Sequence, residues 1–202
     1  MMSDGADRNA CTLPIEPQTA RFETPLCGAS TTPPQDLAAA RATRPSSAAL
    51  VLPDRGLFRQ QMEQRLAQGA VTPLALLYVE VEADPAGAPD GALERILALR
   101  VARALRGDDV VGRMASCQYA CLLTGVPGRH ALDHVAERLR AALEAPLRLG
   151  SGSARVRAHI GIAVCPRDGV TPGVLLKHAD EATFRARAHG FGHTFFDPRL
   201  DP

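Results

Sequence analysis

The sequence predicts an α/β fold in which helices cover the faces of one central sheet. Two observations carry this prediction: segments with helical spacing alternate with apolar, strand-like segments, and two of the strand-like segments are joined by a very short turn. The composition agrees, because 46% of the 202 residues are hydrophobic and 22% are charged, as in folded globular proteins. The net charge of +1 excludes attraction of the whole molecule to nucleic acid or to an anionic membrane.

Residues 1–46 are the part of the chain least suited to a packed core. They are rich in Pro, Ser, Thr and Ala, and the prolines stand too close together for a helix or a sheet to propagate. We therefore expect a disordered tail over 1–46 and one ordered domain over 47–198. A docking segment for a partner is the alternative interpretation of the tail.

The first half of the ordered domain predicts a helix, a strand and a second helix. Apolar residues recur at helical spacing over 53–69, between a Pro-Asp start and a glycine end. Residues 73–84 are a continuous apolar run that passes into alternating valine and glutamate, as expected of a central strand ending in carboxylates. Helical spacing returns over 90–107, where Gly107 suits the helix end. The spaced apolar residues of the first helix are Leu57, Phe58, Met62 and Leu66.

The second half of the domain begins with a hairpin, in which two short strand-like segments flank a turn with Ala115 and Ser116 at its tip. A strongly amphipathic helix follows and ends at Pro146. The remaining segments are an alternating strand, a helix with Thr-Pro at its start and glycine at its end, and a short aromatic strand. In order, these elements are expected at 110–114, 118–123, 131–146, 154–166, 171–190 and 193–196.

Cysteine usage and the absence of apolar targeting segments indicate the compartment. The five cysteines are an odd set without a C-x-x-C pair, so neither a disulfide framework nor a zinc site is predicted. The first residues lack the apolar core of a signal peptide, and no stretch reaches about 18 unbroken apolar residues. We expect a protein of the reducing cytoplasm, without a membrane span.

Several segments, taken in order, resemble GGDEF domains, the catalytic domains of diguanylate cyclases. These segments are LPDRGLF, LLYVEVE, RGDDVVGRMASCQYACLL, VAERLR, HIGIAV and ADEATFRARAHG, and the match spans residues 48–197. A run of spaced motifs in the right order is far more specific than any one of them. The resemblance implies a palm-like central sheet, as in nucleotidyl cyclases and polymerases, with a hairpin at the former active site.

The hairpin departs from the family pattern at all five positions of its signature. Active relatives, which condense two GTP into cyclic di-GMP, carry Gly-Gly-Asp/Glu-Glu-Phe there, whereas this chain has Ala115, Ser116, Cys117, Gln118 and Tyr119. In those relatives the glycines admit phosphates, the first acid holds Mg²⁺ and the second supports attack by the ribose hydroxyl. A thiol is a poor Mg²⁺ ligand, and an amide neither takes up a proton nor balances metal charge. We therefore expect a degenerate domain that is not an enzyme, requires no cofactor and holds no catalytic metal.

Other parts of the substrate site are matched only in part. The resemblance places Glu80 where relatives have a metal-binding aspartate, which makes Glu80 a residual candidate ligand, although a solvated acid at the strand end is the favoured interpretation. Asp90 matches a guanine-contacting aspartate and Arg187 a phosphate-binding lysine. The guanine-contacting asparagine has no counterpart, so we expect an eroded GTP pocket.

Arg106 and Asp109 form an R-x-x-D motif shortly before the hairpin. The motif alone carries little weight, because 22 arginines and 13 aspartates among 202 residues give about one such match by chance. Its position matches the product-binding inhibitory site of the family, and Arg138 matches the second arginine of that site. The resemblance therefore implies that Arg106, Asp109 and Arg138 bind cyclic di-GMP. The alternative is that these residues are inherited but not used.

Two further groups of polar residues are weaker candidates. His130 and His134 stand four residues apart on one expected helix without a third ligand nearby in the sequence, so a solvated helix face is favoured over a metal site. Cys117 is a weak candidate for a redox-sensitive thiol, because no base or second cysteine flanks it at the hairpin tip. Arg113 is expected to anchor the hairpin.

Together these observations predict a signalling receptor or adaptor that binds cyclic di-GMP and passes the signal to an unknown protein partner. A ligand-induced homodimer is a further expectation from the resemblance, because cyclic di-GMP often binds such a site as a stacked pair that bridges two domains. A nucleotide-independent protein-interaction module is the first alternative, and a residual diguanylate cyclase is the second.

Overall fold

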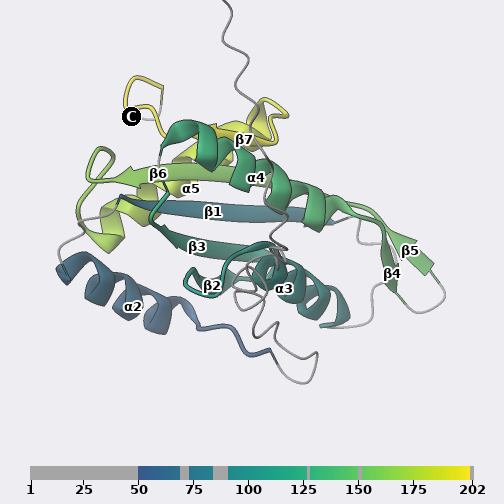
Figure 1. Cartoon of the computed structure of the whole chain (residues 1–202). Coiled ribbons are helices and arrows are strands. Elements are labelled where there is room, and N and C mark those ends of the chain that lie inside the picture. The colour runs from purple at the N-terminus through teal and green to yellow at the C-terminus, as the bar shows by residue number, and fades with distance from the viewer. Residues whose placement is uncertain (1–49, 69–72, 84–90, 127, 150–151, 201–202) are drawn as a thin grey trace, which may run out of the picture. The chain divides into compact units, whose positions relative to one another are not determined.

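A computed structural model of the protein describes residues 50–68, 73–83, 91–126, 128–149 and 152–200 (Figure 1). All of them belong to one unit of the chain, Arg41–Pro202. The expected tail over 1–46, the expected start of the domain at 47 and Asp90 lie outside the described residues. In chain order the elements are α2 Arg55–Ala67, β1 Leu74–Ala83, α3 Ala92–Ala104, β2 Val110–Ala115, β3 Gln118–Thr124, α4 Arg129–Glu144, β4 Leu147–Leu149, β5 Gly152–Ala154, β6 Val156–Cys165, α5 Pro172–Ala188 and β7 His193–Phe195.

The centre of the fold is a five-stranded sheet with the order β2-β3-β1-β6-β7. The middle strand β1 is antiparallel to both neighbours, with Leu77 opposite Cys121 of β3 and Ile162 of β6. At one edge β7 pairs with β6 in parallel. The predicted α/β class, with helices on the faces of an open sheet, is confirmed.

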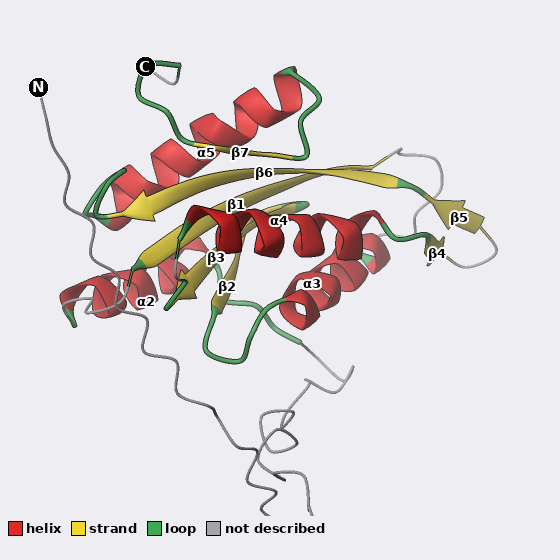
Figure 2. Ribbon diagram, turned by 45° about the horizontal axis from the view of Figure 1, so that its top comes forward, coloured by secondary structure: helices red, strands yellow, loops and turns green. Residues whose placement is uncertain are grey.

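Helices cover both faces of the sheet, so two cores form, one on each side (Figure 2). Alternate residues of β1 enter different cores: Leu77 and Val79 pack with α3 and α4, whereas Leu74 and Leu76 pack with α2 and α5. A strand buried on both faces reads as a continuous apolar run, which explains the sequence of β1.

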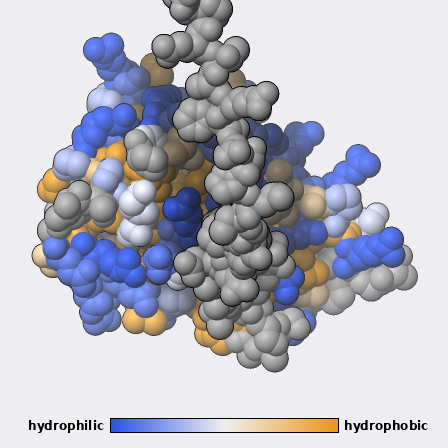
Figure 3. All heavy atoms as spheres, viewed as in Figure 1, coloured by the Kyte–Doolittle hydropathy of each residue, from blue (hydrophilic) through white to orange (hydrophobic). Residues whose placement is uncertain are grey.

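α2 lies against the sheet through one narrow apolar stripe. The Asp54 carboxylate caps its first turn by accepting the Leu57 N–H at 2.9 Å. Phe58 and Met62 are fully buried, whereas Leu57 is 48% exposed. Leu57 shares the helical spacing but lies on the outer side of the stripe. The outward face of α2 is hydrophilic (Figure 3, lower left).

α5 approaches the sheet most closely at Gly161 of β6. A Cβ added to Gly161 would lie 2.0 Å from the Ala179 carbonyl oxygen and 2.3 Å from the Thr183 nitrogen. Thr183 is fully buried there, and its hydroxyl donates to the carbonyls of Ala179 at 2.8 Å and of Tyr78 at 3.1 Å. The glycine therefore sets the spacing between α5 and the central strands.

Three local features differ from the sequence expectations. The two-stranded ladder of β4 and β5 was not expected, because each strand has only three residues. α3 ends at Ala104, before the expected Gly107. The hairpin turns at Ser116 and Cys117 and not at Ala115 and Ser116, because Ala115 pairs with Gln118.

Within the described ranges, none of the helices has the combination of length and hydrophobicity that a membrane span requires.

Candidate functional site

Arg106 and Asp109 lie in the short loop between α3 and β2. The Asp109 carboxylate accepts the Arg106 N–H at 2.9 Å, and the Asp109 N–H donates to the Arg106 carbonyl at 3.2 Å. These reciprocal bonds close the loop and hold the carboxylate beside Arg106. Although the helix was expected to run to Gly107, Arg106 lies just beyond its end, because Leu105 is already extended.

Arg138 reaches this loop from α4. Its Nε donates to the carbonyl of Ala104 at 3.1 Å, a carbonyl at the end of α3 that has no partner within its own helix. The bond occupies Nε, and among the described residues Nη1 and Nη2 of Arg138 have no hydrogen-bond partner. The guanidinium is therefore anchored by one edge and keeps two amino groups for a ligand.

A surface hollow of about 520 Å³ joins the two predicted arginines. Four of its seven lining residues are arginines, and among the described residues no acidic residue lines it, so Asp109 lies beside the hollow and not in its wall; most of the lining surface is apolar. The lining consists of Arg100, Arg103, Ala104, Leu105, Arg106, Arg138 and Ala142. Four cations around one hollow produce a concentrated positive potential, which suits a ligand with phosphates.

Arg100 and Arg103 were not predicted as parts of this site, although their spacing from Arg106 was a usable signal. They stand six and three positions before Arg106, so they lie on successive turns of α3 on the side that leads to the loop. Arg100 donates to three carbonyls just at the end of α4: Leu143 and Pro146, both at 2.8 Å, and Ala145. Burial lowers the pKa of Arg100. Arg100 therefore fastens α3 to α4, whereas Arg103 is exposed.

The five residues at the signature positions of the hairpin are divided between turn and core. Cys117 has a left-handed backbone, with φ of +57°, and its carbonyl accepts the Val81 N–H at 2.9 Å. The Ser116 hydroxyl donates to the Glu94 carboxylate, which also pairs with Arg113 at 3.4 Å. Tyr119 is fully buried. The hairpin is thus tied to α3 and β1, and Arg113 anchors it as expected.

Glu80 is already engaged by neighbouring side chains. Arg187 Nη1 lies 2.9 Å from Glu80 Oε1, and the Gln118 amide donates to the same oxygen at 3.4 Å. Gln118 in turn accepts the Tyr78 hydroxyl at 3.1 Å. Arg187 also reaches Glu82, with its Nε 4.0 Å from Oε1, so a guanidinium holds the place beside these carboxylates where Mg²⁺, which prefers several oxygen ligands, would have to bind. Among the described residues there is also no group of three or more His, Cys, Asp or Glu placed to hold a metal ion.

Two ionisable groups near this part of the sheet have shifted pKa values. Burial raises the pKa of Asp180 on α5, and the nearby Glu80 carboxylate raises it further. Burial also raises the pKa of the Cys117 thiol. A raised thiol pKa reduces the thiolate fraction at neutral pH, so it does not support the weak expectation of a redox-sensitive cysteine.

Comparison with known proteins identifies the family. The model of the family described as "Diguanylate cyclase, GGDEF domain" matches residues 51–193. Diguanylate cyclase TpbB of Pseudomonas aeruginosa is 30% identical over 161 residues, which cover 75% of this chain and 37% of TpbB. The bifunctional diguanylate cyclase/cyclic di-GMP phosphodiesterase MucR of the same species is 28% identical over 159 residues, which cover 74% of this chain and 23% of MucR. The chain therefore spans well under half the length of these relatives.

Solved structures agree with the family model. A truncated form of TpbB that comprises only the GGDEF domain has a TM-score of 0.66 and 27% identity, and the match covers 74% of this chain and 94% of that one. The GGDEF domain of DgcB from Caulobacter crescentus, solved in complex with cyclic di-GMP, shares the fold with a TM-score of 0.61 at 16% identity; the match covers 77% of this chain and 96% of that one. The chain belongs to the GGDEF domain family.

Proposed function

We propose that this GGDEF domain is catalytically inactive and acts as a receptor or adaptor for cyclic di-GMP, bound through Arg106, Asp109 and Arg138. The observation that carries the proposal is the hollow between α3 and α4, which four arginines and, among the described residues, no acidic residue line, with Asp109 held beside Arg106 in the adjoining loop. The receptor would act in the cytoplasm and pass the signal to a protein partner.

The chemistry of the ligand suits these three side chains. Guanine presents O6 and N7 on one edge, which a planar guanidinium grips with two parallel hydrogen bonds. Its N1–H and N2–H₂ groups suit an ionised carboxylate, and the loop holds Asp109 beside Arg106 for that role. The free amino groups of Arg138 and the exposed side chain of Arg103 are then available for phosphate oxygens.

The proposal of inactivity rests on the surroundings of Glu80 and of the hairpin. A cyclase of this family needs carboxylates that hold metal ions and a carboxylate that assists attack by the hydroxyl. Here the hairpin offers a thiol and an amide, and the carboxylate of Glu80 is paired with Arg187 at 2.9 Å. We therefore propose that the domain requires no cofactor and makes no cyclic di-GMP.

Calorimetric titration tests the receptor function. Cyclic di-GMP, with GTP as the comparison ligand, is titrated at fixed salt into wild-type protein, Arg106→Ala, Arg138→Ala and the control Arg95→Ala. Arg95 is exposed on α3 but does not line the hollow. We expect binding of cyclic di-GMP to wild type and control, and at least tenfold weaker binding to the other two variants, since each loses charge-assisted hydrogen bonds.

The outcomes separate the alternatives. No heat from wild type would overturn the receptor proposal and favour a nucleotide-independent interaction module, whose partner binding Arg106→Ala would leave unchanged. Formation of cyclic di-GMP from GTP and Mg²⁺ by wild-type protein would instead establish a residual diguanylate cyclase. Equal loss of binding in Arg95→Ala would show that general charge, and not the hollow, attracts the ligand.

A further inference from the structure

The exposed side chains of His130 and His134 face each other on α4. Their Nε2 atoms are 3.0 Å apart, and the ring centroids are separated by 4.4 Å with an angle of 71° between the planes. The sequence supplied only the spacing of four residues, which places the two side chains on one helix face. The structure adds that each ring turns its Nε2 toward the other, so that the two nitrogens that could bind an ion lie on the same side of the helix and within hydrogen-bond distance of each other.

The distance between the nitrogens is that of a hydrogen bond between the rings, and it is also compatible with two ligands of one ion. Two nitrogens bound at about 2.0–2.1 Å to one ion would stand about 2.9 Å apart at a right angle and about 3.4 Å apart at the tetrahedral angle. The observed 3.0 Å is closer to the first value. Right angles between neighbouring ligands belong to square-planar and octahedral complexes, and square-planar nitrogen sites are typical of Cu²⁺ and Ni²⁺.

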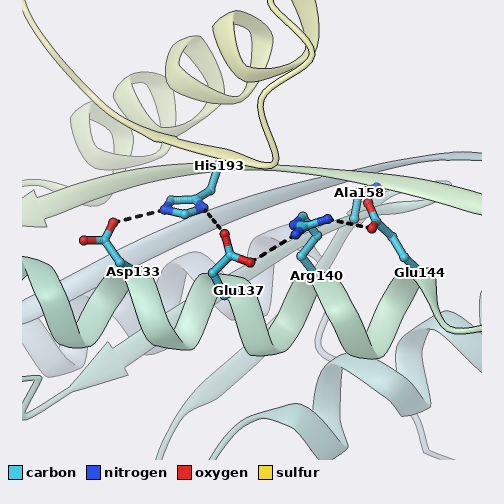
Figure 4. A network of polar contacts seen from close by, with 6 residues as sticks. All are labelled: Asp133, Glu137, Arg140, Glu144, Ala158 and His193. Carbon is cyan, nitrogen blue, oxygen red and sulfur yellow. Dashed lines mark hydrogen bonds and ion pairs between the residues drawn. The ribbon is translucent and has the colours of Figure 1, made fainter.

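The nearest acidic residues of α4 point elsewhere. Asp133 and Glu137 both direct their carboxylates toward His193 of β7, at 3.0 and 3.5 Å, and Glu137 also pairs with Arg140 at 3.0 Å (Figure 4). Within the described part of the chain there is also no three-membered group of metal-binding side chains. Two imidazoles therefore remain, and the other positions of an ion would be filled by water or by an external ligand, unlike a closed structural zinc site.

We propose that His130 and His134 chelate one divalent ion of the late first transition series, Cu²⁺ or Ni²⁺, at an open and exchangeable surface site. Both residues are exposed, so an ion reaches them without any rearrangement of the core. An ion bound to both Nε2 atoms would replace the hydrogen bond between the two rings, in which one Nε2 donates and the other accepts. The neutral imidazole is the form that binds metal, and the affinity order of such sites favours Cu²⁺ over Ni²⁺.

The test uses the full chain without an affinity tag, titrated calorimetrically with NiCl₂ and with CuCl₂. The variants are His130→Ala and His134→Ala, and His189→Ala is the matched control, because it removes an exposed imidazole at the end of α5. We expect one ion per chain in wild type and control, and at least tenfold weaker binding in the other two variants. Electron paramagnetic resonance at one equivalent of Cu²⁺ should show two coordinating nitrogens in wild type and fewer in His130→Ala.

Unchanged affinity in His130→Ala, or an equal loss in His189→Ala, would overturn the proposal. Weak binding of several ions per chain, alike in all variants, would overturn it too and would point to other imidazoles or thiols of the chain, which every variant keeps. Far-UV circular dichroism monitors the fold, and His130→Gln preserves a polar side chain on the same helix face. A loss of binding in His130→Gln with an unchanged spectrum separates the loss of a ligand from the loss of the helix.

Discussion

At the scale of single residues, close packing and side-chain hydrogen bonds fix positions that periodicity in the sequence leaves open. The loop of Arg106 and Asp109 is an example. The R-x-x-D spacing was visible in the sequence. The early end of α3, however, depends on two hydrogen bonds: the Asp109 carboxylate accepts the Arg106 N–H, and Arg138 donates to the Ala104 carbonyl. Arg138 comes from another helix, so no local pattern could reveal its contact.

Gly161 leads to a stability prediction at the same scale. The change Gly161→Ala would place a methyl group 2.0 Å from a backbone oxygen of α5, and backbone moves less easily than the end of a side chain. We expect the free energy of unfolding to fall by about 1–3 kcal/mol, the usual range for an overpacked core. Urea unfolding measures the change.

Gly173→Ala is the control for this prediction. Gly173 lies near the start of α5, and a Cβ there would meet no atom within 4 Å. Alanine favours the helix over glycine, so the control should be neutral or slightly stabilising. A similar loss of unfolding free energy in both variants would mean that the close approach of Gly161 to α5 is not the cause of the destabilisation.

At the scale of elements, the long periodic segments could be predicted, whereas of the three-residue strands only the aromatic β7 could be. β1, α4 and α5 have enough residues for their pattern to show, and the helix start at Thr171 and Pro172 is confirmed. β4 and β5 have three residues each, too few for alternation to be recognised. Their pairing depends on where α4 ends, which is a tertiary property.

The hydrogen bonds from Arg100 to the carbonyls at the end of α4 give a prediction at the scale of elements. The last turn of α4 contains no basic residue, and Arg100 of α3 supplies the cation that the carbonyls of this helix end attract. Arg100→Ala should lower the free energy of unfolding by about 2 kcal/mol, because hydrogen bonds from a charged group are lost.

Arg103→Ala is the matched control on the same helix. Arg103 is exposed, so its removal should change the stability by less than about 0.5 kcal/mol. Chemical denaturation of both variants at equal salt distinguishes them. If Arg100→Ala were as stable as Arg103→Ala, the contacts with the α4 carbonyls would contribute no net stability.

At the scale of the whole molecule, the prediction concerns assembly. The hollow between α3 and α4 is open, and cyclic di-GMP carries two guanines and two phosphates, more groups than the hollow and its adjoining loop engage on one side. Under the proposed function, a second domain would cover the other side. We expect light scattering to show a doubling of mass when cyclic di-GMP is added to wild type. Arg138→Ala should stay at its ligand-free mass.

A ligand-bound wild type that keeps its ligand-free mass would contradict this assembly while leaving the receptor function intact. Arg95→Ala serves again as the control and should double its mass like wild type. The measurement also separates association driven by the ligand from association through exposed apolar side chains of the domain. Association of the second kind would occur without nucleotide.

The contacts of Gln118 limit how the hairpin can change in evolution. Its amide faces Glu80 at 3.4 Å, so a carboxylate at this position would add a second negative charge beside Glu80, where the guanidinium of Arg187 already lies 2.9 Å from the Glu80 carboxylate. A single substitution toward an acidic hairpin would therefore leave one guanidinium shared between the two carboxylates, and a metal ion would compete with Arg187 for the same oxygens. A path from the present sequence to a metal-binding one thus involves Arg187 as well as the hairpin.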